Sequence, residues 1–141
     1  GYGHNYGFEL STVYQANQYW RQTSAYSFSR VNFKNDVLGA SDTAQEQSDS
    51  YPIHQFYSMS SIKLTDRWDF DAIGRYVDRL PAYNIDSYIQ LDLRLAWRPH
   101  RNIEASVAGQ NLLDASQQEF GSSPYTGELA TEVPRSVYGL V

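Results

Sequence analysis

The chain of 141 residues contains no cysteine, which excludes thiol catalysis, disulfide bonds and cysteine-based metal sites. It also has no run approaching the roughly 18 apolar residues that a membrane-spanning helix needs. Positive charge is scarce, because 11 lysines and arginines stand against 16 acidic residues for a net charge of −5, and no basic stripe appears. These absences argue against a nucleic-acid partner, and the length suffices for one domain.

Aromatic residues are abundant, at 15% of the chain, and they include twelve tyrosines. The most informative segment is 87–97, where every second residue from Ile89 to Trp97 is apolar and polar or small residues such as Asp92 and Arg94 stand between them. Because strand side chains alternate between two faces, this period of two predicts one oily face and one wet face. Several other segments repeat the pattern, which is typical of a membrane β-barrel with aromatic girdles.

The fold class predicted from these patterns is all-β, with about seven antiparallel up-and-down strands forming part of a large transmembrane β-barrel. The expected strands cover about 5–15, 19–33, 55–64, 68–80, 87–98, 102–113 and a segment from Val133 onward. Short turns at 16–18, 65–67 and 99–101 alternate with longer loops at 34–54, 81–86 and 114–132. Outer-membrane barrels have short periplasmic turns and longer external loops. We therefore expect the short turns and the carboxyl end in the periplasm, and Trp20, Trp68 and Trp97 in a girdle on that side.

The last third of the chain carries a more specific pattern. A Gly-Gln-Asn-Leu-Leu-Asp element is followed by Glu-Phe and then by Arg-Ser-Val-Tyr; the residues of this motif are Gly109, Gln110, Asn111, Leu112, Asp114, Glu119, Phe120 and Arg135. In this order they resemble the end of TonB-dependent outer-membrane receptors, most strongly over 75–139. The resemblance implies that residues 1–141 are the C-terminal portion of such a barrel, with the plug domain absent and the last strand truncated.

The same resemblance implies a function in active transport rather than catalysis. Receptors of this family take up iron–siderophore complexes or similar large, scarce nutrients with energy supplied by TonB. The expected partners are the lipid bilayer of the bacterial outer membrane, the TonB complex through the missing plug, and the nutrient; no cofactor is expected. An isolated fragment would have two raw sheet edges, so we expect it to self-associate through them.

Individual residues suggest few sites. Tyr83 and Tyr125 fall in predicted external loops and are candidates for a ligand vestibule, although packing within the loop is the commoner role. Asp69, Asp71 and Asp92 are expected to line a water-filled lumen with alternating acids and bases, rather than to bind metal or transfer protons. The three histidines stand apart, without the spacing of metal ligands.

The motif residues have expected structural roles. Asn111 and Asp114 stand where a strand gives way to a loop, so we expect their side chains to bond nearby backbone groups. Arg135, near the outer end of the last strand, is expected to pair with a lumen acid such as Glu104 or Asp92. An alternative to the barrel remains open, namely a soluble or surface-exposed Tyr-rich β-sandwich that serves binding or adhesion. That alternative predicts apolar faces that meet in a dry core.

Overall fold

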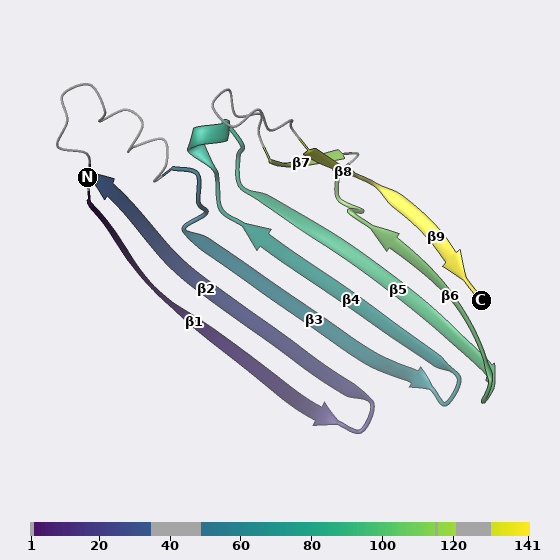
Figure 1. The fold of residues 1–141 in the computed structure, drawn as a ribbon. Coiled ribbons are helices and arrows are strands. Elements are labelled where there is room, and N and C mark those ends of the chain that lie inside the picture. Colours follow the sequence, from purple (N-terminus) through teal and green to yellow (C-terminus); the bar gives the residue numbers. More distant parts are fainter. Residues whose placement is uncertain (1, 35–48, 115, 121–130) are drawn as a thin grey trace.

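The computed structural model describes residues 2–34, 49–114, 116–120 and 131–141. Figure 1 shows one broad sheet whose strands lie side by side in up-and-down order, with β1 and β9 at its two edges. Its seven strands are β1 (Tyr2–Asn17), β2 (Trp20–Lys34), β3 (His54–Thr65), β4 (Trp68–Val77), β5 (Tyr88–His100), β6 (Ile103–Gln110) and β9 (Ser136–Leu140). All neighbouring strands are antiparallel. The predicted all-β fold with seven up-and-down strands is confirmed.

The strands are long. The first two have 16 and 15 residues, and β3 and β5 have 12 and 13. Strands of soluble sheets usually have about five or six residues, whereas a tilted strand needs about nine to eleven to cross the hydrocarbon layer of a membrane. Within the described ranges, no helix is both long and apolar enough to span a membrane.

The connections separate into two kinds at opposite ends of the sheet (Figure 1). At one end, which we call the short-turn end, two-residue turns join β1 to β2, β3 to β4 and β5 to β6. Local side-chain bonds stabilise two of them, because the Asn17 side chain accepts the backbone N–H of Tyr19 at 2.8 Å and the Thr65 hydroxyl accepts that of Arg67 at 3.2 Å. The longer connections all lie at the other end, the long-loop end.

One predicted boundary is wrong at the long-loop end. The strand expected to reach Leu80 ends at Val77, and Leu80 instead pairs with Ile85 across a 3₁₀ turn, η1 (Pro81–Tyr83). Asn84 closes this turn with a left-handed φ of 54°. Leu80 and Ile85 are buried, so this segment is a packed turn rather than an open loop.

The predicted loop 114–132 also needs correction. The strand before it, β6, stops at Gln110 rather than at Leu113, because Asn111 adopts a left-handed φ of 50°. The segment then contains a separate two-stranded sheet of β7 (Ser116–Phe120) and β8 (Thr131–Pro134). These strands have only five and four residues and lack apolar alternation, which is why the sequence pattern did not reveal them.

The strand registers sort the side chains onto two faces. The first, the apolar face, includes Phe8, Leu10, Tyr26, Phe28, Phe56, Phe70, Tyr76, Leu91, Leu93, Leu95 and Val107. The opposite, polar face includes Glu9, Ser11, Ser27, Gln55, Tyr57, Asp69, Asp71, Arg75, Gln90, Asp92, Arg94 and Glu104. The alternation predicted for 89–97 therefore holds across the sheet.

The apolar face is not sealed in a core. In the part of the chain that the structure describes, the buried hydrophobic residues are only Leu80, Ile85, Ala96 and Ala108. Large apolar side chains such as Phe8 and Leu10 are 58% and 59% exposed. A β-sandwich would bury one face of each sheet against the other, so this architecture disfavours the sandwich alternative.

Aromatic rings gather on the apolar face at two levels. Trp68 and Trp97 stand opposite each other at the short-turn end, with ring centroids 5.9 Å apart, and Trp20 begins β2 at the same end. Toward the long-loop end, contacts of 5.4–6.2 Å join the rings of Tyr6, Phe8, Tyr26, Phe28 and His54. All three tryptophans lie on the apolar face toward the short-turn end; Trp20 pairs with Ile62, which stands opposite Phe70, two residues from Trp68.

Candidate functional site: the charged wall

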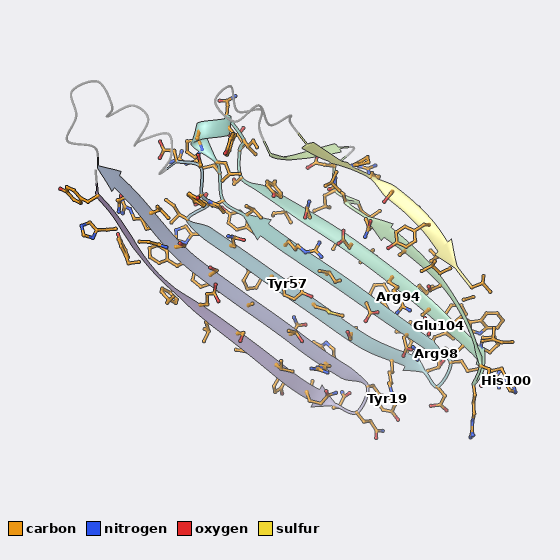
Figure 2. The ribbon with its side chains drawn as sticks, viewed as in Figure 1. Tyr19, Tyr57, Arg94, Arg98, His100 and Glu104 are labelled. Carbon is orange, nitrogen blue, oxygen red and sulfur yellow. The ribbon has the colours of Figure 1, made fainter. Side chains whose placement is uncertain are left out.

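A ladder of ion pairs crosses β4, β5 and β6 on the polar face near the short-turn end. Arg94 bridges Asp71, at 3.2 Å, and Glu104. Arg98 bridges the second oxygen of Glu104, at 2.7 Å, and Asp69. Figure 2 shows Arg94, Arg98 and Glu104 close together where β5 and β6 approach their turn. Acids and bases therefore alternate across three strands, as expected for a wall that faces water.

A further ion pair lies closer to the long-loop end, where Arg75 of β4 meets Asp92 of β5 at 2.7 Å. The guanidinium of Arg75 also lies 6.0 Å from the ring centroid of Tyr57 on β3. The Asp92 side chain is 17% exposed and that of Arg75 is 42% exposed, so the carboxylate lies low against the sheet and the cation is the more open partner. Ion pairs as exposed as this one contribute little to the stability of the fold.

Asn111 links this wall to the long-loop end. Its backbone N–H donates to the second carboxylate oxygen of Asp92 at 3.0 Å, and its side-chain amide donates to the carbonyl of Val133 at 2.8 Å. The residue is only 1% exposed. Asparagine tolerates the left-handed conformation better than most residues do, so it can end β6 at this point. The same residue also bonds the Asp92 carboxylate and the backbone of β8. Its side chain does bond backbone, but at a partner 22 residues away rather than nearby.

The neighbouring motif residues pack around this corner. A Cβ added at Gly109 would meet the Leu112 side chain at 2.9 Å, so a larger residue at 109 would displace that leucine. The backbone N–H of Leu112 donates to the carbonyl of Leu91 at 2.9 Å, and Gln110 accepts a bond from the Ser136 hydroxyl at 3.5 Å. Glu119 and Phe120 lie in β7, and their side chains are outside the described part.

The predicted partner of Arg135 is wrong. Its guanidinium Nε donates to the backbone carbonyl of Asp114 at 3.1 Å. The proposed lumen acids already have other partners, because Asp92 takes Arg75 and Glu104 takes two other arginines. Asp114 thus accepts this bond with its backbone oxygen, whereas we expected its side chain to bond nearby backbone groups.

The two candidate vestibule tyrosines fare differently. Tyr83 is half-buried in η1 at the long-loop end, and Tyr125 lies outside the described residues. Of the histidines, His54 bonds the Tyr26 hydroxyl at 2.8 Å on the apolar face. A search of the described ranges finds no group of three or more histidine or acidic side chains placed to hold a metal ion.

Sequence reasoning missed two cations beside the ladder. Arg21 and Lys63 border a hollow of about 460 Å³ on the polar face, together with Asp69, Arg94 and Arg98. Tyr19, labelled in Figure 2, lies in the same border at the short-turn end. The period of two places positions 21 and 63 on the wet face of their strands, and this signal would have identified them.

Comparison with known proteins gives structural neighbours. No protein-family model matches the chain, and no curated protein matches it. The ferric-catecholate import receptor Fiu of E. coli K12, in its closed form, superposes with a TM-score of 0.73 at 22% identity, over 98% of this chain and 20% of Fiu. The copper transporter OprC superposes with a TM-score of 0.65 at 16% identity, over 97% of this chain and 23% of OprC.

The chain thus spans less than a quarter of either neighbour, and at these identities the likeness establishes the fold. Nearly the whole chain takes part in each superposition, so the match includes the seven-stranded sheet. These matches agree with the motif at 109–135. The chain therefore has the fold of a β-barrel wall segment similar to those of Fiu and OprC.

Proposed function

We propose that this chain is part of an outer-membrane receptor that imports a large, scarce nutrient such as an iron–siderophore complex, with energy supplied through TonB. The neighbours support this proposal, because one is named as an import receptor for ferric catecholate and the other as a copper transporter. Neither is an enzyme, and the segment is assigned no catalytic role. Its role is to supply wall and external loops.

The single observation that carries the proposal is the division of the sheet into two faces. Along β5, every second residue from Ile89 to Trp97 is apolar, over eight residue steps or about 26 Å of strand. At the strand tilt of about 35–45° in outer-membrane barrels, this covers about 20 Å of their roughly 25 Å apolar band. Ion pairs and polar side chains occupy the reverse side. Such a sheet is suited to separate lipid from a wet lumen.

The proposal includes an orientation. We place the short turns and the end of β9 in the periplasm and the long-loop end outside, because outer-membrane barrels have short periplasmic turns. Tyr83, and Tyr125 beyond the described part, then belong to the external loops that border a nutrient vestibule. The segment is the C-terminal portion of a longer barrel, whose plug domain contacts TonB.

Cysteine labelling of the full-length receptor in intact cells tests the orientation. We expect a membrane-impermeant maleimide to label Asn84→Cys, next to η1, without treatment. The matched variant Asp66→Cys, in the turn between β3 and β4, should label only after the outer membrane is permeabilised. The reverse pattern would show that the wall is inserted the other way up.

Uptake assays test the transport function. Cells that depend on the full-length receptor should accumulate radiolabelled ferric catecholate, or another iron chelate from a panel, and should lose that uptake when TonB is deleted. Accumulation that is unchanged by deletion of the receptor gene, across the whole panel, would overturn the assignment to nutrient import.

A further inference from the structure

The apolar face is not apolar throughout. Two rows of paired residues that cross the sheet on this face show the difference. In one row, Gln22 of β2 is followed by Ser60 of β3, Ala72 of β4 and Leu93 of β5; in the next, Ser24 is followed by Ser58, Gly74 and Leu91. In both rows, therefore, β5 presents a leucine whereas β2 and β3 present an amide or hydroxyls.

The polar positions form one connected patch. Thr12 of β1 stands opposite Ser24, Ser24 stands opposite Ser58 of β3, and Gln22 stands opposite Ser60. The Gln22 side-chain amide donates to the Ser58 hydroxyl at 2.8 Å and to the Ser24 hydroxyl at 3.3 Å. The indole N–H of Trp20 donates to the Ser60 hydroxyl at 2.8 Å. We call Thr12, Gln22, Ser24, Ser58 and Ser60 the polar patch.

An open notch borders this patch. Gly74 of β4 lies directly opposite Ser58, and a Cβ built on it meets no atom within 4 Å. The notch, Ala72 and the three serines form a low area beside larger apolar side chains such as Phe56 and Leu91. Between membrane helices, small residues let the two surfaces approach closely, and we apply the same reasoning to this sheet.

Lipid is a poor cover for the polar patch. Gln22 donates its bonds through the amide nitrogen, so its side-chain carbonyl oxygen can still accept a hydrogen bond. A serine hydroxyl that accepts one hydrogen bond can still donate one and accept another. Acyl chains offer no donor or acceptor, so lipid contact leaves this capacity unused at a cost that a protein surface avoids.

We infer that the polar patch is the contact between two copies of the receptor within the membrane. This inference rests on the proposed function, because it requires the apolar face to lie in lipid. The patch carries no charge, and it offers donors and acceptors within the same small area, so it is complementary to itself. A two-fold contact brings the same surface of each copy together, so the Gln22 carbonyl of one copy meets the hydroxyls of its partner.

Disulfide trapping tests the contact in the full-length receptor in outer-membrane vesicles. The segment has no cysteine, so each introduced thiol is unique within it. Under mild oxidation, Ser24→Cys and Ser58→Cys should shift to twice the mass of the receptor. Leu93→Cys, as far from its own tryptophan as Ser24 is from Trp20, should remain at the monomer mass. Adding Gly74→Leu, which fills the notch, should abolish the shift of Ser58→Cys.

Two outcomes would overturn the inference. One is that Ser24→Cys and Ser58→Cys dimerise no more than Leu93→Cys, and the other is a trapped adduct whose mass is that of a different protein. Labelling separates this failure from failure of the proposed function. A water-soluble maleimide should leave Leu93→Cys unmodified in vesicles, and modification there would refute burial of the face in lipid.

Discussion

The carboxylate of Asp92 accepts the backbone N–H of Asn111 at 3.0 Å, and this bond joins the charged wall to the start of the last long connection. The other oxygen of the same carboxylate pairs with Arg75 at 2.7 Å. One acid thus serves both an ion pair between neighbouring strands and the end of β6. The motif around Asn111 therefore has a physical role in fixing where a strand stops.

Loss of the Asn111 side chain should destabilise this corner. Asn111→Ala removes the bond to the Val133 carbonyl, and alanine tolerates a positive φ less well than asparagine does. Loss of a buried bond costs about 1–3 kcal/mol. The free energy of unfolding of the full-length receptor in detergent should fall by that amount. Asn111→Gly, which tolerates the φ, should lose less; equal losses would contradict the role of backbone strain.

Two substitutions at Asp92 separate its roles. Asp92→Asn keeps an oxygen for the Asn111 N–H and removes the charge opposite Arg75, so the loss should be at most about 1 kcal/mol. Asp92→Ala also leaves a buried N–H without an acceptor, which adds about 1–3 kcal/mol. Chemical denaturation of both variants checks the order. If the two lose the same stability, the bond to Asn111 contributes nothing.

The ladder at Glu104 should show salt dependence. Glu104→Gln weakens the contacts to Arg94 and Arg98, and the loss of stability should be small even at low ionic strength, because solvent-exposed ion pairs contribute little. High salt should shrink the difference from wild type, since screening weakens the native pairs. Lys63→Gln is the matched control, because Lys63 makes no ion pair within the described ranges. A salt-independent loss would argue against an electrostatic origin.

A charge on the two faces should have unequal effects. Leu93→Arg places a cation at mid-height on the apolar face, where insertion costs about 2–4 kcal/mol near the bilayer midplane. Ser106→Arg places it on the polar face of β6, where water and Glu104 are near. Yield of folded receptor in the outer membrane should fall for the first and hold for the second. Similar yields would contradict the assignment of the faces.

The main sheet was predictable because each strand pattern is local. The alternation at 89–97 places Leu91 and Leu93 on one face, whichever strands lie beside them. The short connections also indicate that consecutive strands are neighbours in the sheet. For the ion pairs, the sequence predicted that acids and bases alternate on the polar face, but it did not predict which residues pair. The partners of Asp71 and Asp92 depend on the register of β4 with β5, which a single strand pattern does not specify.

Other features depend on contacts between distant segments. The β7–β8 pair has no periodic signal, and the Arg135 guanidinium bonds a backbone oxygen that no side-chain inventory reveals. The end of β6 at Gln110 follows from the positive φ of Asn111, whose partners are 19 and 22 residues away. The sequence named the correct residues in this motif but not their partners.

The most direct test of the central claim is a quenching scan along β5 in the full-length receptor reconstituted in lipid bilayers. A fluorophore is attached in turn to single cysteines at positions 90 to 96, and brominated lipid and aqueous iodide serve as the two quenchers. We predict a strict period of two, with lipid quenching at Leu91, Leu93 and Leu95 and iodide quenching at the positions between them. Uniform quenching along the strand, or iodide access at Leu93, would contradict a wall between lipid and a wet lumen.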